Sequence, residues 1–339
     1  MRWSRSRKLS AAALLVATAV LLPAQSPAGA AQVACSELRV PVSVAGTAQT
    51  MAGTLCAPEG ATSVQVLVPG GTYNRSYWDI AYTPGIRSFR LAMNKAGHAT
   101  FAVDRLGTGE SSKPPSALVT SVVQAEALHQ VVQTLRPRFD KVLIGGHSIG
   151  AAMAMIEAGL HRDVDGVLVT GMTHRMNLVT VAPVLANMIP APLDSQLARR
   201  GPDLGYLTTS PGTRAAAFHG AGKHDPAAIA ADESTKDVFA ATEALDNIAL
   251  TNILIPASRG IDVPVLLALG EGDTHFCGAP LGSDCRSAEA LRASEAPYFS
   301  GSPRFETFIL PGYGHSMNYA PNAPDYHRVV AQWAGSVAS

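Results

Sequence analysis

The stretch that decides the fold is residues 141–160, KVLIGGHSIGAAMAMIEAGL. Its first half is apolar and predicts a buried strand, whereas its alanine-rich second half predicts a helix. Between them lies Gly146-His147-Ser148-Ile149-Gly150. This pentapeptide is either a plain turn or a strained strand-to-helix turn that exposes a nucleophilic serine. The second interpretation needs the strand and the helix to approach each other closely, which the small neighbouring residues allow. The serine hydroxyl would then stand at a helix N-terminus, which stabilises negative charge. The context favours a nucleophile.

Apolar, β-rich segments alternate with helical segments on both sides of this turn, which predicts an α/β fold with a mostly parallel sheet covered on both faces. An opening hairpin is expected at 36–44 and 47–58. Further strands are expected at 63–68, 98–104, 141–146, 164–171, 263–270 and 304–310, and helices at 86–97, 121–135, 149–160, 288–296 and 327–338.

One stretch interrupts the alternation. Residues 175–258 show helix-like pieces cut by prolines and glycines, and no strand pattern. A segment this long is far beyond an ordinary connection. We interpret it as a helical cap inserted between two late strands, over the carboxyl ends of the strands, where ligands of parallel sheets bind. The α/β core then comprises residues 31–174 and 259–339.

The first thirty residues resemble a secretory leader. Basic residues precede an apolar stretch from Leu9 to Leu22, and small residues follow, with Ala28-Gly29-Ala30 as the expected cleavage site. The apolar stretch is too short for a stable membrane anchor. We therefore expect residues 1–30 to be a cleaved signal peptide and the protein to be secreted. The formal net charge of zero gives no indication of a nucleic-acid partner.

The chain has four cysteines, which allow three pairings. Their spacing favours Cys35–Cys56, which would join two early strands, and Cys277–Cys285, which would close a small loop. An oxidising compartment would let both disulfides form. The alternative is four free, buried thiols.

Serine is a weak nucleophile without a base that is oriented by an acid. The strand at 263–270 leads into a loop that carries Asp273, and the strand at 304–310 leads into a loop that carries His315. Both loops are expected at the same edge of the sheet as Ser148. Glu271 is the reserve acid. Asp273 as a loop cap and His315 as a surface histidine remain the alternatives.

The oxyanion of an acyl-transfer reaction needs two hydrogen-bond donors. The N–H group of Ile149, directly after Ser148, is one candidate. The second is expected from the loop after the strand at 63–68, where Gly71 is favoured and Thr72 is the near alternative. In the competing interpretation these glycines only permit a turn.

Five segments together resemble the α/β-hydrolase superfamily, and more closely its secreted, lidded bacterial members: LVPGGTYN, DRLGTGES, IGGHSIGA, LLALGEGD and LPGYGHS. The order Ser148, Asp273, His315 is similar to that of the family's catalytic triad. The resemblance implies that Asp104 and Ser111 of DRLGTGES are structural. One departure is Pro69-Gly70, where many relatives carry His-Gly.

The resemblance implies acyl transfer, with Ser148 as nucleophile, His315 as base and Asp273 as its partner. We expect a secreted serine hydrolase for an ester, lactone or thioester with an apolar part, and no cofactor or metal. The alternative uses the same pocket for non-hydrolytic acyl transfer, cyclisation or binding of an apolar small molecule. Two groups of polar residues fit no zinc pattern, and the one inside the insertion is expected to consist of solvated polar residues. Four further side chains are candidates for the lining of the pocket. The polar groups are His219, His224 and Asp225, and Asp273 with His275; the apolar candidates are Tyr73, Trp78, Met176 and Met188.

Overall fold

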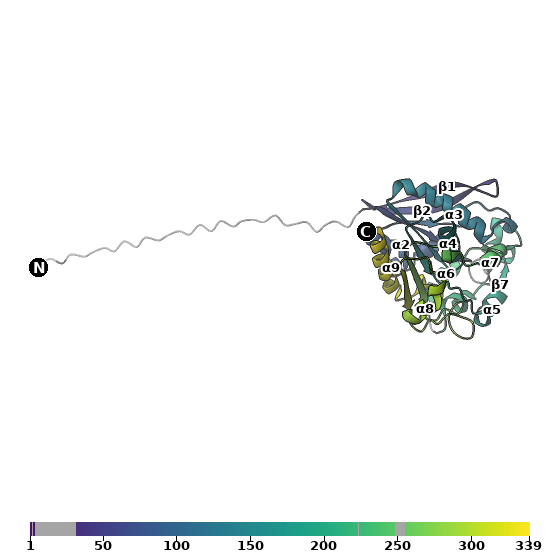
Figure 1. Ribbon diagram of the computed structural model, residues 1–339. Coiled ribbons are helices and arrows are strands. Elements are labelled where there is room, and N and C mark those ends of the chain that lie inside the picture. Colours follow the sequence, from purple (N-terminus) through teal and green to yellow (C-terminus); the bar gives the residue numbers. More distant parts are fainter. Residues whose placement is uncertain (2, 4–31, 223, 248–254) are drawn as a thin grey trace. The chain divides into compact units, whose positions relative to one another are not determined.

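A computed structural model describes residues 1, 3, 32–222, 224–247 and 255–339 (Figure 1). The chain divides into residues 1–30 and residues 31–339, and the account below concerns the second unit. The expected signal peptide and its cleavage site lie outside the described residues. Among those that are described, no helix is long and apolar enough to cross a membrane.

The second unit is built on an eight-stranded sheet with the order β1-β2-β4-β3-β5-β6-β10-β11. The first two strands are antiparallel to their neighbours, and every later pairing is parallel, as the sequence predicts. The strands are β1 (Val33–Val44), β2 (Thr47–Pro58), β3 (Ser63–Val68), β4 (Ala99–Val103), β5 (Lys141–His147), β6 (Gly166–Thr170), β10 (Val265–Gly270) and β11 (Phe305–Leu310).

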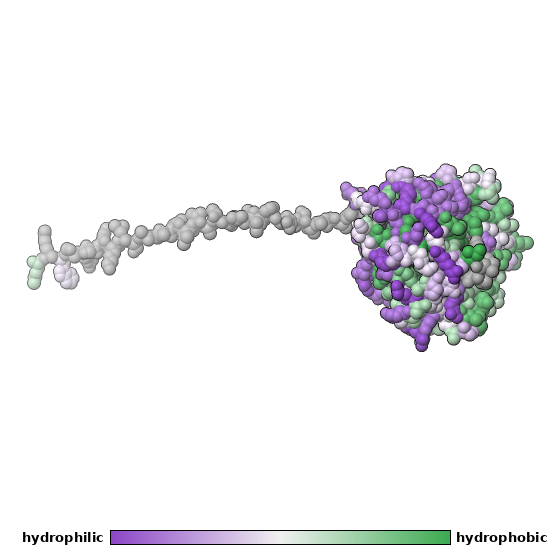
Figure 2. Space-filling view, in the orientation of Figure 1, coloured by the Kyte–Doolittle hydropathy of each residue, from purple (hydrophilic) through white to green (hydrophobic). Residues whose placement is uncertain are grey.

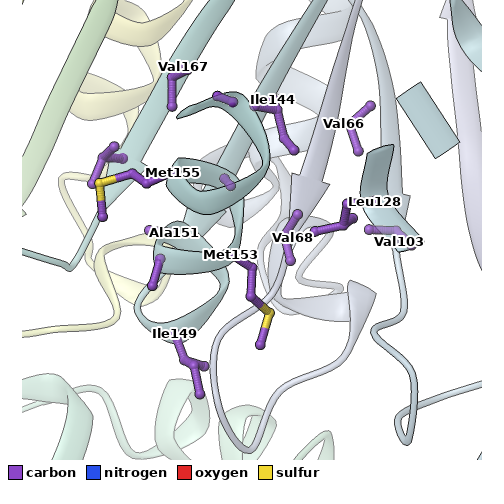
Figure 3. Close-up of a cluster of buried hydrophobic side chains, with 14 of the residues drawn as sticks. Val66, Val68, Val103, Leu128, Ile144, Ile149, Ala151, Met153, Met155 and Val167 are labelled. Atoms are coloured by element: carbon purple, nitrogen blue, oxygen red, sulfur yellow. The ribbon is translucent and has the colours of Figure 1, made fainter. Parts of the chain in front are cut away.

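Helices cover both faces of this sheet, so its central strands are buried on both sides. In β5, Val142 and Ile144 belong to the apolar cluster beneath α3 and α4, whereas Leu143 belongs to the cluster beneath α2 and α9. Figure 3 shows side chains of α4 packed beside those of β3, β5 and β6. The bounds are α2 (Phe89–Lys95), α3 (Ser121–Leu135), α4 (Ile149–His161), α8 (Ala288–Glu295) and α9 (Ala323–Ala338).

The helix expected at 86–97 is divided in two. The short α1 (Pro84–Arg87) ends before Ser88, whose hydroxyl oxygen accepts a hydrogen bond from the N–H group of Leu91 and caps α2. Serine favours this position because its side chain satisfies an N–H group that the first helical turn leaves free. The division therefore follows from local capping.

The segment between β6 and β10 contains helices and a second, three-stranded sheet. The expectation of a cap with no strands is wrong in this respect, because strands of two to four residues are too short to show a polar–apolar alternation. The elements are α5 (Leu178–Ala186), β7 (Met188–Pro190), β8 (Tyr206–Thr209), α6 (Pro226–Ser234), β9 (Phe239–Ala240) and α7 (Ala241–Asn247). We refer to this segment as the cap.

The connection from β5 to α4 depends on glycines. A methyl group at Gly146 would lie 2.2 Å from the carbonyl oxygen of Gly150, and one at Gly150 would lie 2.4 Å from that of Pro69. Both contacts are with backbone atoms, which cannot move aside as a side chain can. The glycines therefore allow the strand and the helix to meet at this distance.

We predict that Gly146→Ala lowers the free energy of unfolding by about 2 kcal/mol, because the added methyl group would clash with backbone atoms that cannot move away. Chemical denaturation of the variant and the wild type measures the difference. Gly85→Ala is the matched control, since a methyl group at Gly85 meets nothing within 4 Å. Equal loss of stability in the two variants would contradict the argument.

Candidate active site

Ser148 lies on a strained turn between β5 and α4. Its backbone has φ 55° and ψ −126°, a region that side chains other than glycine rarely occupy. The Ser148 N–H group donates a hydrogen bond of 2.8 Å to the carbonyl oxygen of Thr170 at the end of β6. A residue held in this conformation usually costs 1–3 kcal/mol, about the strength of one or two hydrogen bonds. Such strain is typical of functional turns and places the side chain at the sheet's carboxyl edge.

Asp273 and His315 meet directly at the same edge of the sheet. Asp273 follows β10, His315 follows β11, and the two strands are neighbours. The Nδ1 atom of His315 lies 2.8 Å from Oδ2 of Asp273, and both side chains are buried. Burial alone raises the pKa of the Asp273 carboxyl, but His315 and then His275 outweigh it and hold that pKa well below its usual range. Asp273 is therefore an anion that accepts a hydrogen bond from the Nδ1–H group of the imidazole.

The loop that carries Asp273 is closed by the disulfide between Cys277 and Cys285. The Cys277 N–H group donates to the carbonyl oxygen of Asp273 at 3.0 Å, and the His275 N–H group donates to its Oδ1 at 2.9 Å. Glu271, the reserve acid, instead accepts a hydrogen bond from the N–H group of Gly312. The geometry thus favours Asp273 over Glu271 as the partner of His315.

The second expected disulfide, Cys35–Cys56, is also present, and it joins β1 to β2 at directly opposed positions. Both disulfides are thus paired as the spacing favours, and no cysteine is free. Two disulfides in one chain indicate an oxidising environment such as the outside of the cell.

His147, the residue directly before Ser148, lies against the imidazole of His315. The rings of His147 and His315 have centroids 4.6 Å apart, and a methyl group at Gly171 would touch both. No hydrogen bond joins the Ser148 hydroxyl to His315 in this structure. Catalytic hydrogen bonds are often long before substrate binds. The structure therefore brings Asp273 and His315 together, with Ser148 beside them but not bonded to them.

Two further histidines surround His315. His275 stacks on it with ring centroids 4.1 Å apart, and His147 stacks on Tyr77 at 4.4 Å. Burial, followed by the charge of His315, lowers the pKa of both His147 and His275. These rings are therefore neutral near pH 7. The Nδ1 atom of His275 lies 3.6 Å from Asp273, beyond hydrogen-bond distance, which leaves His315 as the ring bonded to the carboxylate.

The two expected oxyanion donors lie in one place. Gly71 and Ile149 both line the cavity that contains Ser148, and a methyl group at Gly71 would be 3.5 Å from the Ile149 side chain. The next residue, Thr72, has φ 63°, which turns the loop sharply. Its carbonyl oxygen accepts a hydrogen bond from the N–H group of Asp237 at 2.9 Å. This bond anchors the Gly71 loop to the cap.

A buried network in the cap connects the Gly71 loop with the His315 loop. Arg214 donates to the Thr72 hydroxyl oxygen at 2.9 Å and to Asp232 at 2.8 Å. Asp232 also contacts Nε2 of His219 at 2.8 Å and accepts from the Tyr73 hydroxyl at 3.3 Å. The expectation that His219 is a solvated polar residue is wrong, because its side chain is fully buried against Asp232. Sequence shows no such partner, since the two residues meet only after folding.

The network reaches the histidine loop in two ways. The Tyr73 hydroxyl is 2.8 Å from the Ser316 hydroxyl, next to His315. In addition, the N–H groups of Gly314 and Ser316 donate to the carbonyl oxygens of His219 and Phe218 at 3.1 and 2.8 Å. The cap therefore holds the backbone on both sides of His315.

The cavity at Ser148 has a volume of about 200 Å³ and is mainly apolar. Met176 and Met188 line it as expected, but Tyr73 and Trp78 do not, because the first is held in the cap network and the second packs on Phe89. A larger hollow of about 840 Å³ lies beside the loop of Cys277 and Cys285 and does not include Ser148. The other cavity residues are Thr72, Met172, Val181, Val184, Leu185, Phe218, Phe239, Ala244, Asn247, His275 and Phe276.

Apolar side chains are also exposed around this cavity. Figure 2 shows a hydrophobic area on the side where Figure 1 labels α5, β7 and α7. Leu185 is 53% exposed and also lines the cavity, so the cavity opens within this area. Among the described residues of the cap, the other large apolar side chains that are exposed are Leu178, Val179, Leu193, Leu204, Leu245 and Ile255. An apolar molecule would meet apolar surface at the entrance.

The sequence matches the model of the alpha/beta hydrolase family over residues 65–331. The chain belongs to the alpha/beta hydrolase family. The eight-stranded sheet has the arrangement that this membership implies, and the parallel order of its strands explains why Ser148, Asp273 and His315 share one edge.

Solved structures with this alpha/beta hydrolase fold include three that cover most of the chain. A thermophilic esterase from Thermogutta terrifontis is 18% identical, with 89% of this chain and 100% of that chain covered and a TM-score of 0.61. A putative hydrolase from Bacillus subtilis is 15% identical, with coverage of 89% and 93% and a TM-score of 0.60. A putative aryl esterase from Burkholderia cenocepacia is 15% identical, with coverage of 88% and 99% and a TM-score of 0.57. A comparison with curated proteins finds no match.

The DRLGTGES loop of this alpha/beta hydrolase has a structural arrangement. Asp104 accepts hydrogen bonds from the N–H groups of Arg75 and Glu110, both at 2.9 Å. The Ser111 hydroxyl donates to the carbonyl oxygen of Asp104 at 2.7 Å. These bonds close the loop on itself and fit the structural role that the resemblance implies.

Two groups of side chains in the described part of the chain have the spacing of metal ligands: Asp273, His275 and His315, and separately His129, Glu157 and Asp163. The first group is the site described above. There, Nδ1 of His315 is already occupied by its hydrogen bond to Asp273. The other carboxylate oxygen of Asp273 accepts a hydrogen bond from the N–H group of His275, so both of its oxygens have partners and the arrangement fits a hydrogen-bonded pair better than a metal site.

We predict that Asp232→Asn lowers the free energy of unfolding by about 3–5 kcal/mol near pH 7, because it leaves the buried Arg214 without its anion. Burial alone raises the pKa of Asp232, but Arg214 and His219 outweigh it and lower the pKa below its ordinary value. A lowered pKa stabilises the folded state above the unfolded value of about 3.9, and this stability is lost as the pH falls further.

Denaturation of wild type and variant between about pH 7 and pH 3 tests both effects. Asp232→Asn should show a smaller loss of stability below about pH 4 than the wild type. Asp246→Asn, in the same segment, is the control and should behave as the wild type. An unchanged acid dependence in Asp232→Asn would refute the assignment of the lowered pKa to this network.

Proposed function

We propose that this protein is an exported serine hydrolase that cleaves a carboxylic ester, lactone or thioester through an acyl-enzyme on Ser148. The observation that carries the proposal is the buried hydrogen bond between Asp273 and His315 beside the strained turn of Ser148. A serine hydroxyl gains reactivity only from a base held in the right tautomer, and this pair supplies such a base.

In the proposed reaction His315 takes the proton of the Ser148 hydroxyl as its oxygen attacks the carbonyl carbon. Asp273, whose pKa is held low, stabilises the imidazolium that forms. His315 then donates that proton to the leaving group, and the acyl group stays on Ser148. Water attacks the acyl-enzyme by the same steps and restores the free serine.

The negative charge that develops on the carbonyl oxygen needs fixed donors. The N–H groups of Gly71 and Ile149 are proposed for this role, because both residues line the cavity at Ser148. Ile149 is also the first residue of α4, where N–H groups have no partner within the helix. A donor of this kind typically contributes about 3 kcal/mol to the transition state.

An apolar part of the substrate is proposed to fill the cavity, since methionine, valine, leucine and phenylalanine side chains line it. The exposed apolar area at its entrance supports the same substrate class. Two of the similar solved structures are described as an esterase and a putative aryl esterase. Ester hydrolysis is therefore the first activity to test.

Export is supported by the leader-like residues 1–30 and by the two disulfides. A metal, a nucleic-acid partner or a cofactor has no part in the proposed reaction. Because the leader is cleaved in this proposal, the secreted enzyme retains no membrane anchor.

A second candidate function keeps the same pocket for acyl transfer to an acceptor other than water, for cyclisation, or for binding an apolar small molecule. The observation that favours a binding role is the mainly apolar lining of the cavity at Ser148, which would hold an apolar molecule without any reaction. A serine-directed fluorophosphonate separates these functions, because simple binding does not make a serine reactive.

We predict that the wild type reacts with a fluorophosphonate probe and hydrolyses chromogenic esters, whereas Ser148→Ala does neither. The loss of hydrolysis should be roughly 10⁴-fold or more, since the serine acts as a unit with its base. Mass spectrometry of the labelled protein locates the modified residue. Ser43→Ala, at a β1 serine remote in sequence from the turn, should label normally.

Labelling of the wild type without turnover of any ester would favour transfer or cyclisation. Failure of the folded wild type to label would contradict the enzyme proposal and favour binding.

We also predict that Val184→Phe reduces kcat/KM for long acyl esters by about tenfold while acetyl esters react nearly as before, because the larger ring shortens the cavity. Val184 is buried and lines the cavity. Val179→Phe introduces the same ring on the same helix at a residue that is 60% exposed, and it should leave the preference unchanged. If both variants shift the preference equally, the acyl group does not occupy this cavity.

A further inference from the structure

A second cluster of titratable side chains lies between α3 and α4. It consists of His129 in α3, Glu157 in α4 and Asp163 just after α4, and its candidate ligand atoms all lie within 4.8 Å of one another. Nδ1 of His129 is 2.8 Å from Oδ2 of Asp163 and 3.9 Å from Oε1 of Glu157. Glu157 is nine residues beyond Ser148, which corresponds to about 14 Å along the helix. The cluster is therefore separate from the candidate active site.

Glu157 is the unusual member of the cluster. Its side chain is completely buried, no N–H group donates to either of its carboxylate oxygens, and its hydrogen-bonding neighbour is another acid. A second carboxylate, Asp163, lies beside it. Two carboxylates in one buried site need a proton or a cation between them, because their charges repel and water is excluded.

The nearby arginine does not fill this need. The guanidinium of Arg136 donates to the carbonyl oxygen of Asp163 at 2.8 Å and to the carboxylate of Asp165 at 2.5 Å. Its hydrogen bonds are therefore directed to neighbouring groups and not to Glu157. Glu157 remains a buried acceptor, and the Nδ1 atom of His129 and the carboxylate of Asp163 lie next to it.

We propose that His129, Glu157 and Asp163 bind a divalent transition-metal ion of the zinc type. One imidazole nitrogen and two carboxylate oxygens suit Zn²⁺ better than Ca²⁺ or Mg²⁺, which prefer oxygen ligands alone. Ligand bonds of about 2.0–2.2 Å in tetrahedral geometry place ligand atoms roughly 3.5 Å apart. The distances from Nδ1 of His129 to Asp163 and to Glu157, 2.8 and 3.9 Å, lie on either side of that value. Modest side-chain movement would therefore complete the site.

The surroundings hold the ligands in place and leave a route for the ion. His161 stacks on His129 with ring centroids 3.9 Å apart, and Gln133 donates to Asp163. Such contacts to ligands orient them and strengthen metal binding. His129 is 27% exposed and Asp163 16%, so an ion can enter from solvent and water can take the fourth position. The bound ion would fasten α3 to α4 and to the loop that enters β6.

The test is calorimetric titration of the metal-free, disulfide-bonded protein with ZnCl₂. We expect one ion per chain in the wild type and at least roughly tenfold weaker binding in Glu157→Gln. Glutamine keeps the volume of glutamate, and its amide can donate to Asp163, so the variant should fold. Glu126→Gln is the matched control, because Glu126 contacts His161 on the same surface and is outside the cluster. It should bind zinc as the wild type does.

Two further readouts separate this site from the one at His315. The titration is repeated in His315→Ala, which removes a ligand from the group of Asp273, His275 and His315, and one ion should still bind. Zinc should also raise the unfolding temperature of the wild type and of His315→Ala, but not of Glu157→Gln, because an ion that binds only the folded state stabilises it. These outcomes do not depend on whether the protein hydrolyses esters.

The proposal is overturned if the wild type binds no zinc, or if Glu157→Gln binds it with unchanged affinity. In either case a proton shared by Glu157 and Asp163 accounts for the buried pair. Loss of binding in His315→Ala would likewise reject the cluster between α3 and α4 as the site. Tighter binding of Ca²⁺ than of Zn²⁺ would reject the proposed ligand chemistry.

Discussion

The candidate active site depends on the close contact between β5 and α4 at Ser148. The serine backbone is held in an unfavourable conformation by its hydrogen bond to Thr170, and glycines at 146 and 150 leave room for neighbouring carbonyl groups. If the two elements moved apart, the hydroxyl would leave the edge where β10 and β11 deliver Asp273 and His315. The buried sheet opposes that movement, because its central strands are covered on both faces by apolar side chains.

The cap completes the site in a way that its sequence does not reveal. Arg214 and Asp232 are fully buried, and together with Tyr73 they connect the loop of Gly71 to the residue after His315. A buried ion pair of this kind contributes little net stability compared with apolar packing, but it fixes the positions of the groups that it joins. In this protein those groups are the two loops on which the proposed chemistry depends.

Much of the fold could be predicted from the sequence, because the strands of the main sheet are long enough to show apolar runs and are separated by clear helical patterns. The positions of Asp273 and His315 followed from the same pattern, since each comes directly after a strand. His275, Arg214 and the burial of His219 could not be predicted in this way. A buried polar residue is defined by its partners, and Asp232 or His315 becomes a neighbour only in the folded chain. The strands β7, β8 and β9 were missed because they are too short to show a period.

The backbone bonds from Gly314 and Ser316 to His219 and Phe218 have a consequence for how this enzyme class diversifies. A cap that is attached to the core only at its two ends could be replaced by recombination without disturbing the catalytic loops. Here the segment that shapes the pocket also supports the proposed base. A transplanted cap would therefore have to bring its own support for the base, so new specificity is more easily reached through point changes along α5 than through exchange of the whole segment.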